Sequence, residues 1–95
     1  MSANGNSAPK FLLGRIVATP NALNQIQNDE MFNALSRHVR GDWGELDRED
    51  LDANENALKH GGRLFSRYIS TAGVKFWIIT EWNRKITTIL LPEDY

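Results

Sequence analysis

The sequence predicts a small α+β domain, with two or three helices packed on a mostly antiparallel sheet of three to four strands. The main observation is the last third of the chain, where three β-rich segments (63–71, 74–82 and 85–92) are separated by two residues each, as in a hairpin meander. The middle of the chain instead places apolar residues at helical spacing. A length of 95 residues fits one domain.

The amino-acid composition excludes some classes of function for this protein. The chain has no cysteine, which excludes disulfides and thiolate metal sites and makes the cytoplasm the expected location. A net charge of −1 argues against a strongly basic nucleic-acid binder. No apolar run approaches the ~20 residues that span a bilayer, and the N-terminus lacks the apolar segment of a secretory signal. We therefore expect a soluble protein with no membrane partner.

The first ten residues, MSANGNSAPK, are small, polar and turn-forming, so we expect residues 1–10 to be a flexible tail and 11–95 to be the domain. The apolar, β-branched run 11–19 predicts a strand, weakened at Gly14. Thr19 and Pro20 then have the residue types of a helix N-cap and first helical position.

The region 20–39 predicts two helices with a break near Asn28 rather than one continuous helix. Gly41 is a natural stop after the second of them. The spacing of the apolar residues predicts the side chains that face the core, which are Leu23, Ile26, Met31, Phe32, Leu35 and Val39.

The loop GDWG (41–44) puts a tryptophan between glycines in a charged stretch. A third helix is predicted to begin after Asp47 and to run to about His60, with Leu46 and Leu51 at the spacing of a hydrophobic staple. We expect Trp43 to be a buried plug where the helices diverge, with Asp42 bonding amides of its own turn. The alternative is an exposed recognition tryptophan.

If both hairpin loops have two residues, Ile69 pairs with Phe76, Ile78 with Ile89 and Phe76 with Leu91. The core face of the sheet would then consist of Phe65, Ile69, Val74, Phe76, Ile78, Ile89 and Leu91. We expect the helices to pack on that face.

The opposite face of the sheet is also apolar in this register. An antiparallel sheet with one face in water normally alternates apolar and polar residues along each strand, so that the solvated face is polar. We expect a cover on it: another part of the chain, a homodimer partner or another macromolecule. The predicted contact surface is Tyr68, Trp77, Ile79 and Leu90.

Three strings, GRIVATPNAL, RHVRGDWGELDRED and FWIITEWNRKITTILLPEDY, resemble a family of small bacterial proteins associated with plasmids, phages and other mobile elements. The resemblance covers residues 13–95, and its GDWG and TTILLP segments are distinctive. Members tend to read TE-x-DR-S where this chain reads TEWNRK, so Asn83 and Lys85 depart from the pattern. The resemblance implies a setting in mobile genes and implies no catalytic residues.

No catalytic motif is present: there is no phosphate-binding glycine loop, nucleophile elbow or Cys/His pair. Helices followed by an antiparallel sheet are also the layout of small metal-independent ribonucleases, which need a base, an acid and a cation to converge. In that reading the catalytic residues would be His38, Arg67, Glu81 and Arg84. The two histidines stand alone, so we expect no metal site and no cofactor.

The expected function is therefore a non-enzymatic accessory or protein-interaction module of a bacterial mobile element, modulating host defence or plasmid functions. Its partner would be another protein or a second copy. The alternative is a metal-independent ribonuclease-like or nucleic-acid-binding protein. Sheet aromatics near cations such as Arg67 and Arg84 can stack bases, whereas the acidic run GELDREDLDANE would repel a phosphate backbone.

Overall fold

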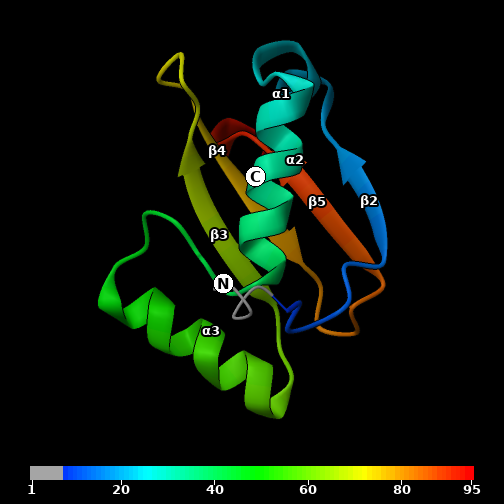
Figure 1. Cartoon of the computed structure of the whole chain (residues 1–95), viewed down its shortest axis with the longest axis vertical. Helices are drawn as coiled ribbons and strands as arrows, with labels where there is room; N and C mark the ends of the chain where they lie inside the picture. Colours follow the sequence, from blue (N-terminus) through cyan, green and yellow to red (C-terminus); the bar gives the residue numbers. More distant parts are fainter. Residues whose placement is uncertain (1–7) are drawn as a thin grey trace.

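The computed structural model describes residues 8–95. It contains a mixed four-stranded sheet in the order β2-β5-β4-β3 (Figure 1). The strands are β2 (Arg15–Ala18), β3 (Leu64–Ile69), β4 (Lys75–Thr80) and β5 (Ile86–Leu90). The last three form an antiparallel meander, and β2 lies parallel to β5. The α+β class and the C-terminal meander are thus confirmed.

The helices are α1 (Pro20–Gln25), α2 (Asn28–Val39) and α3 (Arg48–His60), followed at the C-terminus by a short 3-10 turn, η1 (Pro92–Asp94). Figure 1 shows α2 crossing one face of the sheet, while α3 lies beside the β3 edge. We call the face under α1 and α2 the helix face and the opposite one the open face. The predicted break between two helices is confirmed at Ile26 and Gln27.

Both predicted helix caps are formed. The Thr19 hydroxyl accepts a hydrogen bond from the Ala22 amide at 3.1 Å, with Pro20 at the first helical position. The Asp47 carboxylate accepts one from the Asp50 amide at 2.9 Å, where α3 begins. These local signals are reliable because a cap depends on residues only two or three positions away.

The register between β3 and β4 differs from the prediction by one residue. Tyr68, rather than Ile69, pairs with Phe76. The turn contains Thr71, Ala72 and Gly73 instead of two residues: the Ser70 amide bonds the Val74 carbonyl, and Gly73 has a φ of 83°. A three-residue hairpin loop with glycine in the left-handed region is a standard alternative to the two-residue turn.

This shift moves every side chain of β3 to the other face of the sheet. Phe65 and Ile69 were predicted in the core, yet they lie on the open face, and Ile69 is exposed. The β4–β5 register is as predicted, with Ile78 opposite Ile89. Phe76, Ile78, Ile89 and Leu91 are buried in the main core, as expected.

Two predicted core residues of the helices are exposed instead, namely Leu23 and Phe32. In the six-residue α1, Ala22 takes the buried position. In α2 the buried stripe ends on His38, and Val39 is only partly buried. The buried residues Met31, Ala34, Leu35 and His38 have the spacing i, i+3, i+4, i+7 of one helix face.

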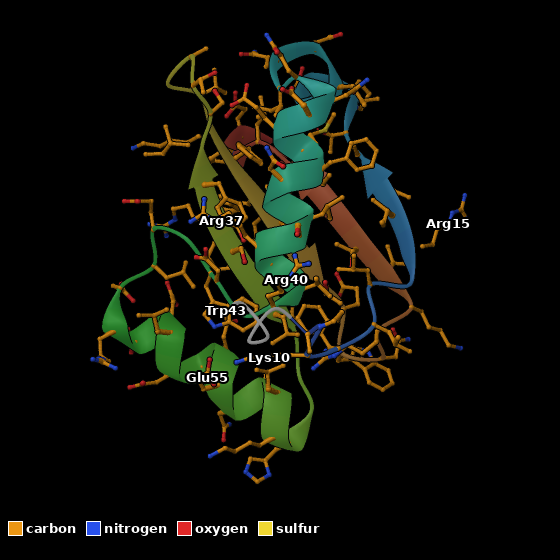
Figure 2. All side chains as sticks on the ribbon, viewed as in Figure 1. Lys10, Arg15, Arg37, Arg40, Trp43 and Glu55 are labelled. Carbon is orange, nitrogen blue, oxygen red and sulfur yellow. The ribbon has the colours of Figure 1, made fainter. Side chains whose placement is uncertain are left out.

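Trp43 is buried with 3 % of its surface exposed, in a second small core with Ala57 and Leu64. Leu46 and Leu51 pack against this core, so the structural-plug interpretation is confirmed. Figure 2 shows Trp43 and Glu55 close together, and the indole N–H donates to the Glu55 carboxylate at 3.0 Å.

Asp42 bonds an amide of its own turn, that of Gly44, at 3.4 Å, as predicted. Its shorter contact is with the Arg37 guanidinium, at 2.8 Å, which holds the pKa of this carboxyl below its ordinary value. Residues 1–7 of the predicted tail lie outside the described residues. At the end of that segment, the Lys10 amide donates to the Val39 carbonyl at 2.8 Å.

Candidate functional site

His38, one of the four residues of the ribonuclease alternative, belongs to α2 and is fully buried. Its Nδ1 lies 2.5 Å from the Ser66 hydroxyl of β3, and its Nε2 lies 2.9 Å from the Thr80 hydroxyl of β4. The Thr80 oxygen lies 2.7 Å from that of Thr87, which donates to the Leu13 carbonyl at 2.7 Å. A polar chain therefore crosses the helix face of the sheet.

The direction of this chain fixes the tautomer of His38. Because Thr87 uses its proton on a carbonyl, it accepts from Thr80, and Thr80 in turn accepts from the imidazole. Nε2 therefore carries the proton, and Nδ1 accepts from Ser66. Every donor is used once, which satisfies a buried polar group without any charge.

Burial, with a smaller contribution from the Arg84 charge, lowers the pKa of His38 from 6.5 to about 3. Phe11 packs edge-on against the imidazole and also lies under the Arg84 guanidinium. His38 is thus a neutral structural group of the core, with none of its surface exposed.

Arg84 has a structural role as well. It is the only residue other than glycine with a positive φ, 60°, in the described part of the chain. Its guanidinium donates to the carbonyls of Gly62 at 2.5 Å and of Ala57 at 3.2 Å, and it also reaches those of Glu81 and Trp82. A cation on the last carbonyls of α3 favours the negative end of that helix.

Arg67 and Glu81 lie away from His38, on the open face. Arg67 pairs with Trp77 across the sheet, and Glu81 bonds Arg63 at 3.3 Å. The four residues of the ribonuclease alternative therefore do not converge. His38 is in the core, Arg84 caps α3, and Arg67 and Glu81 lie on the open face.

Three of the four residues predicted as a contact surface lie on one face of the sheet, where Ile79 and Leu90 are each 5 % exposed. Trp77, Ile79 and Leu90 lie on the open face together, since Trp77 pairs with Leu90. Tyr68 does not join them, because the register shift turns it to the helix face. There it is 2 % exposed and its hydroxyl donates to the Asp42 carbonyl at 2.7 Å, under the Arg37 guanidinium. Burial raises the pKa of this phenol well above its ordinary value.

The open face contains a groove of about 330 Å³, which we call the open-face groove. Its walls are two arginines, three aromatic rings and one aliphatic side chain: Arg63, Phe65, Arg67, Trp77, Ile79 and Tyr95. Trp77 makes edge contacts with Phe65, at 5.1 Å between ring centroids, and with Tyr95, at 5.7 Å. The end of the chain thus folds back over β4 and partly covers the apolar face.

The two arginines of this groove differ in how they are held. Arg63 donates to the Tyr95 hydroxyl at 2.7 Å and pairs with Glu81, so its position is fixed from two sides. Arg67 lies over the Phe65 ring, and its Nε is the one buried side-chain nitrogen or oxygen among residues 8–95 that has no hydrogen-bond partner. A buried donor without an acceptor is costly, and a ligand could supply that acceptor.

The open face is strongly basic. Strand pairing places Arg15 and Lys75 on it together with Arg67, and Arg63 lies at its edge. Glu81 is the carboxylate that reaches this groove, through Arg63. Since the whole chain has 11 basic and 12 acidic residues, most carboxylates lie elsewhere, notably along α3.

Phe65 was missed as a site residue, because the predicted two-residue turn put it in the core. The Thr-Ala-Gly sequence at 71–73 carried the signal for a three-residue loop, since its third position needs the left-handed backbone that glycine supplies. Nothing local in the sequence indicates that Tyr95 returns to the sheet, because that contact depends on the tertiary fold.

Comparison with protein-family models, with curated proteins and with solved structures finds no match to this chain. Within residues 8–95 no helix is long and apolar enough to cross a membrane. The same residues contain no cluster of three or more histidine, aspartate or glutamate side chains placed to hold a metal ion.

Proposed function

We propose that the protein is a non-enzymatic interaction module, and that its open-face groove receives a segment of a protein partner that carries a carboxylate beside an apolar side chain. The observation that supports this most directly is the buried, unpartnered Nε of Arg67 within an aromatic groove. A carboxylate would satisfy this donor, and an apolar side chain would fill the space beside Trp77.

The shape of the groove favours a peptide over a nucleic acid. The three rings meet edge to face, so Trp77 presents an angled pocket rather than a row of parallel surfaces on which bases stack. Single-stranded nucleic acid is the second candidate, favoured by the combination of aromatic rings with Arg15, Arg63, Arg67 and Lys75 on one face.

The charge of the open face also disfavours a second copy as its occupant. A two-fold contact brings the same patch of two molecules together, so the basic side chains would face one another. The partner is therefore expected to be acidic. The sequence resemblance suggests the setting, a cytoplasmic accessory protein of a mobile element that modulates host defence or plasmid functions.

The test is a selection of random peptides displayed on phage against the purified protein, followed by fluorescence anisotropy with the enriched peptides. We expect enrichment of an acidic residue next to a leucine or an aromatic residue. Arg67→Gln should weaken binding by about tenfold or more, since a charge-assisted hydrogen bond contributes roughly 1.5–3 kcal/mol.

The matched control is Arg48→Gln, the same substitution at an arginine whose side chain is 85 % exposed on α3, which should leave binding unchanged. A 12-nucleotide single-stranded RNA and its DNA counterpart form the second arm of the experiment. If these bind and no peptide does, with the loss again specific to Arg67→Gln, the nucleic-acid alternative replaces the proposal. Equal losses in both variants would contradict a role for this groove.

A further inference from the structure

A second surface lies at the edge of the sheet, along β2. Among residues 8–95, this strand pairs with β5 alone. The amides of Arg15 and Thr19 donate toward β5, to the carbonyls of Lys85 and Ile89. Because alternate residues of a strand direct their main-chain groups to opposite sides, the N–H and C=O groups of Ile16 and Ala18 point away from the sheet.

The other edge of the sheet, along β3, is covered at Phe65 and Arg67. The amide and carbonyl of Phe65 both bond the Asn54 side chain of α3, at 3.0 and 2.6 Å. Those of Arg67 bond the Trp43 carbonyl of the GDWG loop at 3.1 Å and the amide of the next residue after that loop, Glu45, at 2.7 Å. Figure 1 shows α3 and this loop beside β3, whereas β2 lies at the opposite border of the fold.

The edge of β2 is flanked by apolar surface on the helix face. Ile16, Leu23 and Phe32 are exposed by 47, 58 and 71 %. They border a groove of about 350 Å³, the edge groove, whose floor includes Met31 and Leu35. None of the charged residues in the described part of the chain lines it. Exposed apolar side chains beside unpaired main-chain groups are the features by which a sheet accepts an additional strand.

We propose that a second copy of the chain pairs with this edge, β2 against β2 in antiparallel orientation, to form a continuous eight-stranded sheet. If Ile16 of one copy lies opposite Ala18 of the other, all the outward main-chain groups of both residues form hydrogen bonds. The two-fold axis then passes beside Val17. On the helix face the large Ile16 lies next to the small Ala18, so the side chains fit.

The charges of this edge are compatible with self-pairing, in contrast to those of the open face. Arg15 is the one charged residue of β2. In the antiparallel pair the two copies of Arg15 lie at opposite ends, about 13 Å apart at ~3.3 Å per residue, beyond the screening length of about 8–10 Å at physiological salt. Figure 2 shows Arg15 extending away from the body of the fold.

The absence of cysteine from the chain allows a direct test. Val17→Cys places one thiol beside the two-fold axis, in a pair without hydrogen bonds, where Cα atoms lie about 4.5 Å apart and a disulfide can form. Mild oxidation should convert most of this variant into a covalent dimer. The control is Ile69→Cys, on the opposite edge strand, which should remain largely monomeric on a denaturing gel.

Sedimentation equilibrium of the unmodified chain should show a dimer that dissociates on dilution. Ala18→Pro removes an outward N–H without breaking a bond to β5, and Ile16→Lys puts a charge on the edge, so each should give a monomer with an unchanged circular dichroism spectrum. Ile69→Lys, at a side chain of similar exposure (51 %), should remain a dimer.

Trp77→Glu should also remain a dimer. An unmodified chain that is monomeric at 100 µM, on the order of a weak dimer's dissociation constant, would overturn the proposal, as would equal cross-linking of the two cysteine variants. A dimer that Trp77→Glu dissociates would assign the contact to the open face instead. None of these outcomes bears on peptide binding by Arg67, so the two proposals can fail separately.

Discussion

At the scale of single residues, two side chains that invite a functional reading are structural. His38 is neutral and fully used by its hydrogen bonds, and Trp43 fills the junction between the loop and α3. The residue with an unmet requirement is Arg67, whose Nε has no acceptor among the described residues. Candidate site residues chosen by residue type alone therefore differ from those chosen by their contacts in the structure.

His38 should make the protein sensitive to mild acid. Its pKa is about 3 in the folded protein against an ordinary 6.5, so between these values the unfolded chain binds more protons. The free energy of unfolding should therefore fall as the pH is lowered through this window, by up to about 1.4 kcal/mol per pH unit. Urea denaturation between pH 7 and about pH 4.5, above the ordinary carboxylate range, measures this slope.

The control for this slope is His38→Gln, which retains an amide that can hydrogen bond but cannot titrate. This variant should be less stable at pH 7 and should have a flatter dependence on pH. A slope that is unchanged in His38→Gln would mean that other groups cause the acid sensitivity.

Truncation of Trp43 should destabilise the whole domain. Trp43→Ala removes a buried ring that contacts Ala57 and Leu64, and the usual cost of such a change is about 3–5 kcal/mol. Trp82→Ala is the matched control, since Trp82 is 70 % exposed, and it should change the free energy of unfolding by less than about 0.5 kcal/mol. Chemical denaturation of both variants compares them directly.

At the scale of elements, a feature could be predicted from the sequence only where the interaction that forms it is short in range. The caps of α1 and α3 were predicted correctly because Thr19 and Asp47 act on residues of the first turn. The face of β3 was not, because one extra residue in the 71–73 turn reverses the whole strand. Hydrophobic periodicity also predicted that Phe32 is buried, whereas it is exposed. The buried stripe of α2 instead includes His38, a polar residue that a hydrophobic pattern does not select.

The corrected register makes a quantitative prediction for two isoleucines of the meander. Ile78→Ala should cost roughly 2–5 kcal/mol, because Ile78 is fully buried in the main core. Ile69→Ala should cost less than about 1 kcal/mol, since that side chain is half exposed on the open face. Equal losses of unfolding free energy in the two variants would contradict the observed register and would support the one in which Ile69 pairs with Phe76.

At the scale of the whole molecule, the open face of the sheet and α3 carry opposite charge. The sheet presents Arg15, Arg67 and Lys75 on the open face, while α3 begins with Glu49 and Asp50. In the proposed dimer the axis runs perpendicular to the sheet, so both open-face grooves lie on the same side. Two linked sites of this kind would bind a repeated acidic segment more tightly than either site alone.

In the proposed dimer, the GDWG loop, which pairs with β3 at its outer edge, would also limit how many copies can associate. In the language of polymer chemistry, a subunit with one reactive end can only couple once, whereas a subunit with two reactive ends grows into a chain. A Cβ on Gly44 would lie 2.1 Å from the Arg67 carbonyl oxygen, and Gly44 has a φ of 79°, so Gly44→Ala must push the loop away from β3. Combined with Asn54→Ala it should free the second edge and turn the proposed dimer into filaments, detectable as growing light scattering with thioflavin fluorescence. Adding Ala18→Pro to the same variant should act as a chain terminator and suppress that growth.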